Sequence, residues 1–289
     1  MESIAFGIAN GTAFFVGLGI FWVSVALTIF SKLGLVRSFG NIGCLLSLGI
    51  VVLSGTPLPL WEYVAWGIIT VGFLSSVNRF RNKPFTLQFG TLALAGTVAL
   101  SMLMAVQELP YRPTPIFRVT PSAQVYVIGD SISAGMGGDK VLWPTVLSQI
   151  TGLRVTNLAQ PGATVESAQK QIAKIPKVPS VVILEIGGND LLGGVPAWQF
   201  RKGLEAILVQ LHGGGDQLLM FELPLYPLKN AFGQAQRDLA QKYGVTLVPK
   251  RVFTSILETE GATLDGLHLS SSGHRVFAST TAGILKITK

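Results

Sequence analysis

The sequence predicts two unlike parts: an all-α transmembrane domain of four helices, followed by an α/β domain whose parallel sheet is covered by helices on both faces, giving three α/β/α layers. Three observations lead to this prediction. Charged residues are scarce in the first part, four long stretches there carry no charge, and the second part alternates short apolar strands with helical segments.

The charge distribution divides the chain. Its 289 residues are 49% hydrophobic and 13% charged, whereas a soluble domain carries about 25% charged residues. Residues 1–119 hold 10 charged side chains, and the other 170 residues hold 27. The high apolar content, the aperiodic glycines and the single Cys44 exclude a disordered chain, a collagen-like chain and a disulfide scaffold. The net charge of +7 is diffuse, so we expect no nucleic-acid partner.

The first 107 residues are predicted to form the membrane domain. A membrane span needs about 20 mainly apolar residues, and the four uncharged stretches here contain 29, 24, 16 and 24 residues. The third is extended at its start, which places Glu62 at the membrane interface beside Trp61, Tyr63 and Trp66, where aromatic side chains are favoured. The expected helices span 8–30, 39–56, 60–78 and 86–107.

Neither a soluble core nor a signal peptide fits these stretches well. Four apolar runs with short polar breaks are atypical of the buried core of a soluble protein. A cleaved signal peptide carries a basic region before its apolar run, and no basic region precedes the first run here.

Basic residues in the short loops predict the orientation of the four spans. Loop 31–38 carries two basic residues and loop 79–84 carries three, whereas the amino-terminal tail and loop 57–62 carry none. The positive-inside rule places the two basic loops in the cytoplasm. We therefore expect an integral, multi-pass protein of the plasma (inner) membrane, with residues 108 onward on the periplasmic or extracellular side.

Residues 108–122 are predicted to be a Pro-rich linker. Four prolines within 15 residues prevent a continuous helix and favour an extended spacer. Such a spacer holds the following domain close to the membrane surface.

Residues 123–289 alternate strands with helices. Continuous apolar strands separated by helical segments are typical of a parallel sheet covered on both faces. In such sheets, functional groups gather beyond the carboxyl ends of the strands. The expected strands span 124–129, 154–158, 180–186, 217–222 and 245–248, and the expected helices 143–150, 164–175, 198–212, 231–243 and 272–286.

Four polar clusters fall at one rim of this predicted sheet. Residues 129–131, 157–162 and 187–190 each follow a strand, and residues 265–268 precede the last helix. Taken singly, each is typical of a helix cap, a turn or a surface pair. Together they supply a hydroxyl, an imidazole, a carboxylate and an amide, the groups that acyl transfer requires.

The four clusters resemble the motif blocks of the SGNH hydrolase (GDSL esterase/lipase) superfamily, which supply Ser, Gly, Asn and His in that order. The resemblance covers residues 124–286 and is closest to the lysophospholipase/arylesterase branch; Asn157 and Gly162 hold the places of the second block, whose following residues are less typical. The matching segments are Val127-Ile-Gly-Asp-Ser-Ile-Ser-Ala-Gly135, Leu184-Glu-Ile-Gly-Gly-Asn-Asp-Leu191, Asp265-Gly-Leu-His268 and Ser272-Gly-His-Arg275. The resemblance implies a flavodoxin-like sheet.

The resemblance also implies a role for each site residue. Ser131 is expected to be the nucleophile, His268 its general base and Asp265 the carboxylate that orients the imidazole. The backbone N–H groups of Ser131 and Gly162 and the side-chain amide of Asn189 are expected to form the oxyanion hole. Three histidines and one cysteine without close ligand spacing predict no metal site, and no cofactor is expected.

These residues predict a membrane-anchored serine esterase that hydrolyses acyl esters, of a lysophospholipid or another lipid-like molecule. The nucleophile elbow of α/β-hydrolases, Gly-x-Ser-x-Gly, does not fit, because Ser133 occupies the place of its second glycine. Two alternatives remain open: an O-acyltransferase or deacetylase of cell-surface glycan, and a non-catalytic membrane scaffold. The expected partners are a lipid or acylated surface substrate and the bilayer; the sequence defines no oligomeric state.

Overall fold

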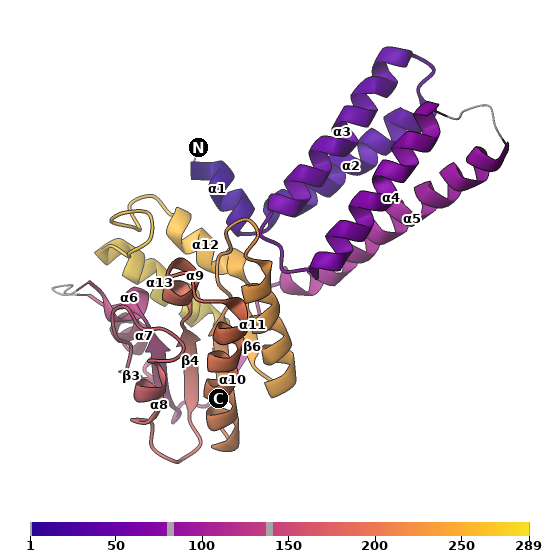
Figure 1. The fold of residues 1–289 in the computed structure, drawn as a ribbon. Helices are drawn as coiled ribbons and strands as arrows, with labels where there is room; N and C mark the ends of the chain where they lie inside the picture. The colour runs from indigo at the N-terminus through magenta and orange to yellow at the C-terminus, as the bar shows by residue number, and fades with distance from the viewer. Residues whose placement is uncertain (1, 80–83, 137–140, 289) are drawn as a thin grey trace. The chain divides into compact units, whose positions relative to one another are not determined.

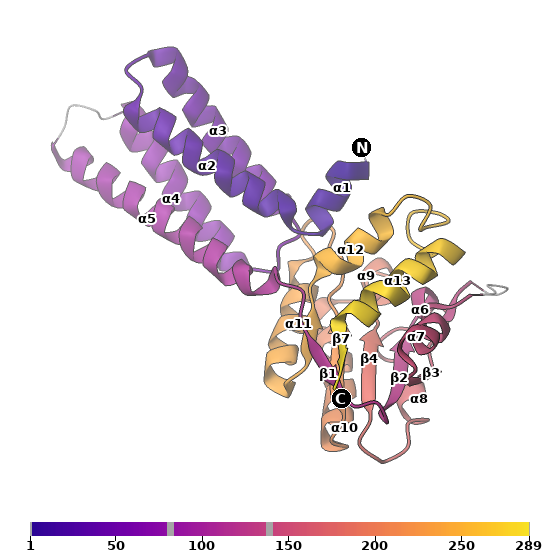
Figure 2. The same cartoon turned by 180° about the vertical axis from the view of Figure 1, so that it is seen from behind.

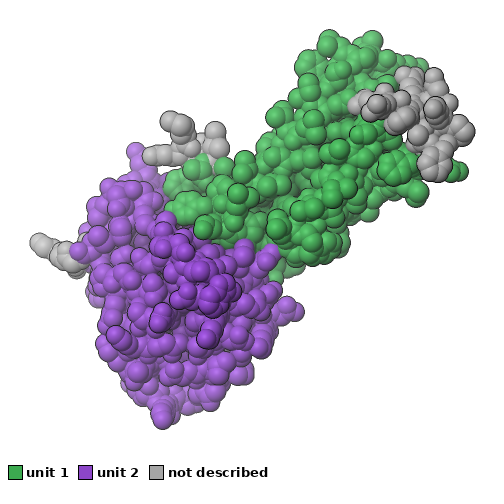
Figure 3. Space-filling model, in the orientation of Figure 1, with its two compact units in different colours: residues 1–112, 225–230 green, residues 113–224, 231–289 purple. Residues whose placement is uncertain are grey.

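The computed structural model describes residues 2–79, 84–136 and 141–288. The chain divides into two compact units (Figure 3). The first comprises residues 1–112 together with 225–230, and the second comprises residues 113–224 and 231–289.

The first unit is built from helices (Figure 1). Among its described residues, four helices are long and apolar enough to cross a membrane. The first of these begins at Thr12, later than expected, because Gly11 adopts a left-handed conformation with φ of 79° and the side chain of Asn10 accepts the N–H of Thr12 at 2.7 Å. The helices are α1 (Glu2–Ala9), α2 (Thr12–Phe30), α3 (Gly34–Leu53), α4 (Leu60–Arg79) and α5 (Pro84–Glu108), followed by the short helix η1 (Leu109–Tyr111).

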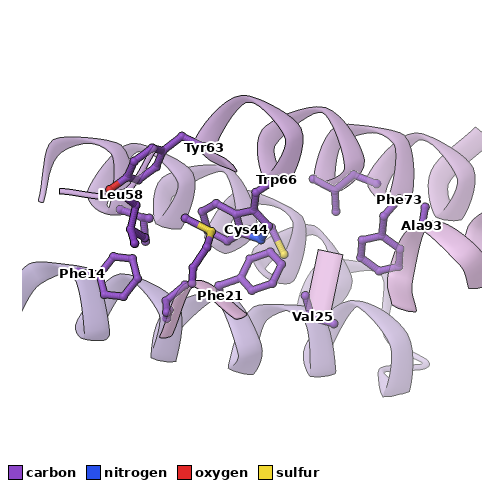
Figure 4. Packing of buried hydrophobic residues seen from close by; sticks show 13 residues of the cluster. Phe14, Phe21, Val25, Cys44, Leu58, Tyr63, Trp66, Phe73 and Ala93 are labelled. Atoms are coloured by element: carbon purple, nitrogen blue, oxygen red, sulfur yellow. The ribbon is translucent and has the colours of Figure 1, made fainter. Parts of the chain in front are cut away.

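Aromatic side chains fill the core of this unit (Figure 4). Phe21 of α2 and Trp66 of α4 meet edge to face with 4.8 Å between ring centroids. Tyr63 is also buried and donates its hydroxyl to the carbonyl of Thr56 at 2.7 Å. Of the three aromatic residues expected at the membrane interface, only Trp61 is exposed, because positions 63 and 66 lie on the face of α4 that packs into the unit.

Glu62 is buried as well, with an exposed fraction of 2%. One of its carboxylate oxygens accepts a hydrogen bond from the side-chain amide of Gln107 on α5 at 3.1 Å. The side chain of Glu62 therefore turns toward α5, where an amide donor partly offsets the loss of hydration.

The close packing of α2 against α3 leaves no room for a side chain at one glycine of α3. The α-carbon of Gly40 faces the backbone of Ser24 and Thr28 so closely that a β-carbon has no room, whereas Gly49 on the same helix faces open space. We expect Gly40→Val to destabilise the full chain by about 1–3 kcal/mol through overpacking. Thermal unfolding in detergent measures this, with Gly49→Val as the matched control. Equal unfolding temperatures for the two variants would contradict the packing described.

The second unit is a five-stranded parallel sheet with strand order β3-β2-β4-β5-β6. Figure 1 shows helices α8, α10 and α11 on one side of this sheet, and Figure 2 shows α7, α12 and α13 on the other, which confirms the predicted three-layer α/β/α fold. The strands are β2 (Gln124–Gly129), β3 (Arg154–Asn157), β4 (Val181–Glu185), β5 (Gln217–Phe221) and β6 (Thr246–Val248); the helices are α7 (Trp143–Thr151), α8 (Gln169–Ile172), α10 (Ala197–Gly213), α11 (Asn230–Tyr243), α12 (Lys250–Glu258) and α13 (Ser271–Ile284).

A second, two-stranded sheet was not expected. Strand β1 (Phe117–Val119) lies within the Pro-rich segment and pairs in parallel with β7 (Leu285–Ile287). The closing helix therefore ends at Ile284, two residues before the predicted end. Three-residue strands carry too short a pattern to be recognised in a sequence.

The helix expected over residues 164–175 is also wrong in extent, since only α8 is helical there. The hydroxyl of Ser167 accepts the N–H of Thr164 at 2.9 Å, and the hydroxyl of Thr164 accepts the N–H of Ser167 at 3.3 Å. These local bonds compete with a regular helix and leave a turn.

Candidate active site

The first polar cluster forms a tight turn at the end of β2. Asp130 caps the short helix α6 (Ser131–Ala134), and its carboxylate accepts the N–H of Ile132 at 3.0 Å. Ser131 is therefore the first residue of a helix, at the carboxyl edge of the sheet and half-buried. Gly129 precedes the turn at a position where a β-carbon would collide with Ser133 and with the carbonyl of Glu185.

The third cluster forms helix α9 (Gly188–Leu192) just beyond β4. Gly187 has φ of 112°, and a β-carbon there would meet the ring of Phe200 at 2.7 Å, so only glycine fits. The side-chain amide of Asn189 donates to the carbonyl of Ala163 at 3.0 Å and lies 3.3 Å from a carboxylate oxygen of Asp130. Asn189 therefore connects the third cluster to the first and to the residue that follows the second.

Gly162 lies in the second cluster, in an exposed turn with φ of 72°. Its neighbour Ala163 is the residue whose carbonyl binds Asn189. Asn157, from the same cluster, donates its side-chain amide to the carbonyl of Ser133 at 2.8 Å. The turn containing Gly162 is thus held to both the Ser131 turn and the Asn189 helix.

The fourth cluster pairs Asp265 with His268. The Nδ1 atom of His268 lies 2.7 Å from one carboxylate oxygen of Asp265, while the other oxygen accepts the backbone N–H groups of Leu267 at 3.0 Å and His268 at 2.8 Å. The hydrogen bond from the His268 ring, followed by those backbone bonds, lowers the pKa of Asp265 to about 2. Asp265 is therefore ionised at neutral pH, and its carboxylate selects the tautomer of His268 that carries a proton on Nδ1.

Electrostatics connect His268 to the nucleophile turn. Burial raises the pKa of Asp130 to about 6, and this increase is opposed by the bond from Ile132 and by the electrostatic interaction with the imidazole of His268. His268 is therefore within electrostatic range of the residue next to Ser131. Among the described residues, no hydrogen bond joins Ser131 to His268; such bonds often tighten only when substrate is bound.

Three polar residues around the turn were not anticipated from the sequence. Gln171 of α8 brackets Gly129, accepting its N–H at 3.0 Å and donating to its carbonyl at 2.9 Å. Ser133 donates its hydroxyl to the carboxylate of Glu185 at 2.7 Å. For Glu185, the sequence offered one signal: it is an acidic residue at the end of an otherwise apolar strand. A fully buried acidic residue almost always has a polar partner, so such a position indicates one.

Residues 127–276 match the GDSL-like Lipase/Acylhydrolase family. The chain is 25% identical over 163 residues to the Thioesterase 1/protease 1/lysophospholipase L1 of Escherichia coli (strain K12), covering 53% of this chain and 78% of that protein. It is 28% identical over 139 residues to the Esterase TesA of Pseudomonas aeruginosa, covering 43% of this chain and 68% of that protein. The crystal structure of TesA has a TM-score of 0.51 at 24% identity, covering 56% of this chain and 97% of that chain, which shows a shared fold.

Proposed function

The chain belongs to the GDSL-like lipase/acylhydrolase family of ester-hydrolysing enzymes, and we propose that it is a membrane-anchored serine esterase that uses Ser131, His268 and Asp265 to cleave acyl esters of lysophospholipids or similar lipids. The observation that carries the proposal is the meeting of the polar clusters at the carboxyl edge of the sheet. Asn189 contacts Asp130 next to Ser131, and the imidazole of His268 interacts electrostatically with the same Asp130.

The proposed reaction begins with proton transfer from the hydroxyl of Ser131 to Nε2 of His268. The Ser131 oxygen forms a bond to the ester carbonyl carbon, and the resulting tetrahedral intermediate expels the alcohol, which takes the proton from His268. Water then gives a proton to His268 and attacks the acyl carbon; the bond to the Ser131 oxygen breaks, the acid is released, and His268 returns the proton to that oxygen. Asp265 keeps Nδ1 protonated throughout, so that Nε2 remains free to accept the proton.

The negative oxygen of the intermediate is assigned to the N–H groups of Ser131 and Gly162 and the amide of Asn189. We expect Asn189→Ala to lower kcat by about 10²–10³, the usual cost of losing one oxyanion donor. Steady-state kinetics with a soluble nitrophenyl ester measures this. An unchanged kcat would remove Asn189 from the oxyanion hole.

Membrane anchoring is supported by the four long apolar helices. A tethered domain meets membrane substrates at a high effective concentration, which favours a lipid ester over a soluble one. The lysophospholipase in the name of the Escherichia coli relative points to the same substrate class. Hydrolysis rates of the full chain on esters from acetyl to palmitoyl, including lysophospholipids, test this proposal; exclusive activity on acetyl esters of glycans would contradict it and favour the deacetylase.

The second candidate, an O-acyltransferase or deacetylase of surface glycan, uses the same site. The ratio of acyl transfer to a sugar and to water decides between transferase and esterase, since both form the same acyl-enzyme. A non-catalytic scaffold is disfavoured because it would have no use for the full set of Ser131, Asn189 and the hydrogen-bonded Asp265–His268 pair.

The orientation is part of the proposal. It places loops 31–38 and 79–84 in the cytoplasm and the catalytic domain on the outer side of the plasma membrane; residues 80–83 of the second loop lie outside the described residues. We expect a reporter active only outside the cytoplasm to work when fused after residue 289. A fusion that is active only in the cytoplasm would contradict this orientation.

A further inference from the structure

One buried carboxylate lies directly behind the nucleophile turn. Glu185 is the last residue of β4, and its register partner on the neighbouring strand β2 is Gly129, the residue at which the turn begins. The side chain is only 2% exposed. The catalytic steps proposed above do not use it.

Glu185 is bonded to the turn that carries Ser131. Its carboxylate accepts the hydroxyl of Ser133 at 2.7 Å. Trp143 donates its indole N–H to the same Ser133 oxygen at 3.1 Å. Because that N–H can only donate, the Ser133 hydroxyl is left to direct its own proton at Glu185.

Such an arrangement is costly for folding. Burial, followed by the nearby charge of Asp130, raises the pKa of Glu185. A buried ionisable group is often replaced by a well-packed apolar residue with no loss of stability, or even a gain. The hydrogen bond of the Glu185 carboxylate ends on Ser133, in the same turn as Ser131, so this group stabilises the turn that carries the proposed nucleophile.

We propose that Glu185 is a positioning residue for the esterase reaction: by bonding Ser133 two residues beyond Ser131, it holds the turn so that the Ser131 hydroxyl and N–H keep the geometry for attack. This inference rests on the proposed role of Ser131. A displacement of about 1 Å at a reacting group can cost 10² in rate. Loss of this bond is therefore expected to lower kcat strongly and to change KM little.

The test replaces Glu185 in the full chain by two side chains of similar length. We expect Glu185→Met, which cannot form the bond to Ser133, to lower kcat on a soluble nitrophenyl ester by about 10² and to slow fluorophosphonate labelling of Ser131 equally. Glu185→Gln, whose amide oxygen can still accept the Ser133 hydroxyl, is expected to recover most of the rate. Ser133→Ala removes the same bond from its donor side and is expected to lower kcat as well.

Glu222 provides a matched control for the cost of losing a buried carboxylate. It lies just beyond β5, is fully buried, and accepts the N–H of Lys250 at 2.9 Å and the Nε–H of Arg237 at 2.7 Å. We expect Glu222→Gln to lower the unfolding temperature while keeping kcat. The inference is overturned if Glu185→Met and Ser133→Ala label and turn over as fast as the unmodified chain, or if, like Glu222→Gln, they lower the unfolding temperature and keep kcat. Absence of label on Ser131 in the unmodified chain overturns the proposed function itself.

Discussion

Replacing Ser131 by alanine is expected to lower kcat for ester hydrolysis by about 10⁶, because the acyl-enzyme can no longer form. The protein is expected to fold normally. The Ser131 hydroxyl makes no hydrogen bond to any other residue that the structure describes, so its removal leaves no polar group unpaired. Rates on a nitrophenyl ester and on a lysophospholipid, together with the unfolding temperature, measure both expectations.

The matched control is Ser255→Ala, which removes an exposed hydroxyl from helix α12. It is expected to hydrolyse both substrates at the rate of the unmodified chain. If Ser131→Ala also keeps its full activity, Ser131 is not the nucleophile and the reaction proposed above is wrong.

Replacing Asp265 by asparagine is expected to lower kcat by about 10⁴, the cost of presenting the wrong histidine tautomer. The asparagine oxygen can still accept the backbone N–H groups of Leu267 and His268, so the loop is expected to keep its shape. The side-chain NH2 group of the asparagine then faces Nδ1 of His268 as a donor. The ring must carry its proton on Nε2, where it can no longer accept one from Ser131.

The ionisation of Asp265 also predicts how the kcat deficit of Asp265→Asn depends on pH. The folded pKa of Asp265 is lowered to about 2 from an ordinary value of 3.8, so its ionised form stabilises the fold above about pH 4, and this contribution is lost as the pH falls toward 2. Asp265 therefore remains charged across the neutral range, and we expect its own ionisation to add no pH dependence to the Asp265→Asn deficit in kcat between pH 6 and pH 8. Asp238→Asn, which breaks an exposed ion pair with Arg201, is the control. An Asp265→Asn variant no slower than this control would remove Asp265 from the catalytic machinery.

The sheet could be predicted from the sequence because its strands are continuous apolar runs. Val181–Glu185 is buried along its whole length, as expected for a central strand of a parallel sheet. Local hydrogen bonds were harder to foresee. The hydroxyls of Thr164 and Ser167 replace an expected helix by a turn, and strands β1 and β7 form only because two three-residue segments far apart in the chain pair with each other.

The polar clusters of the site could also be predicted, because each follows a strand or precedes a helix within a short motif. The contacts that support them join distant residues, and no spacing rule shows those in advance. Ser133 and Glu185 are 52 positions apart, and Glu62 and Gln107 are 45 apart. In both cases the visible signal was an acidic residue in an apolar stretch, which indicates a buried partner but does not identify it.

The central claim is that Ser131 is activated by His268. Its most direct test is fluorophosphonate labelling of the full chain, in which the serine oxygen bonds to phosphorus and fluoride leaves, followed by mass spectrometry of the labelled peptide. The account predicts label on Ser131, and labelling that is greatly slowed in His268→Gln. Label on a different residue, or equally fast labelling of Ser131 without His268, would contradict it.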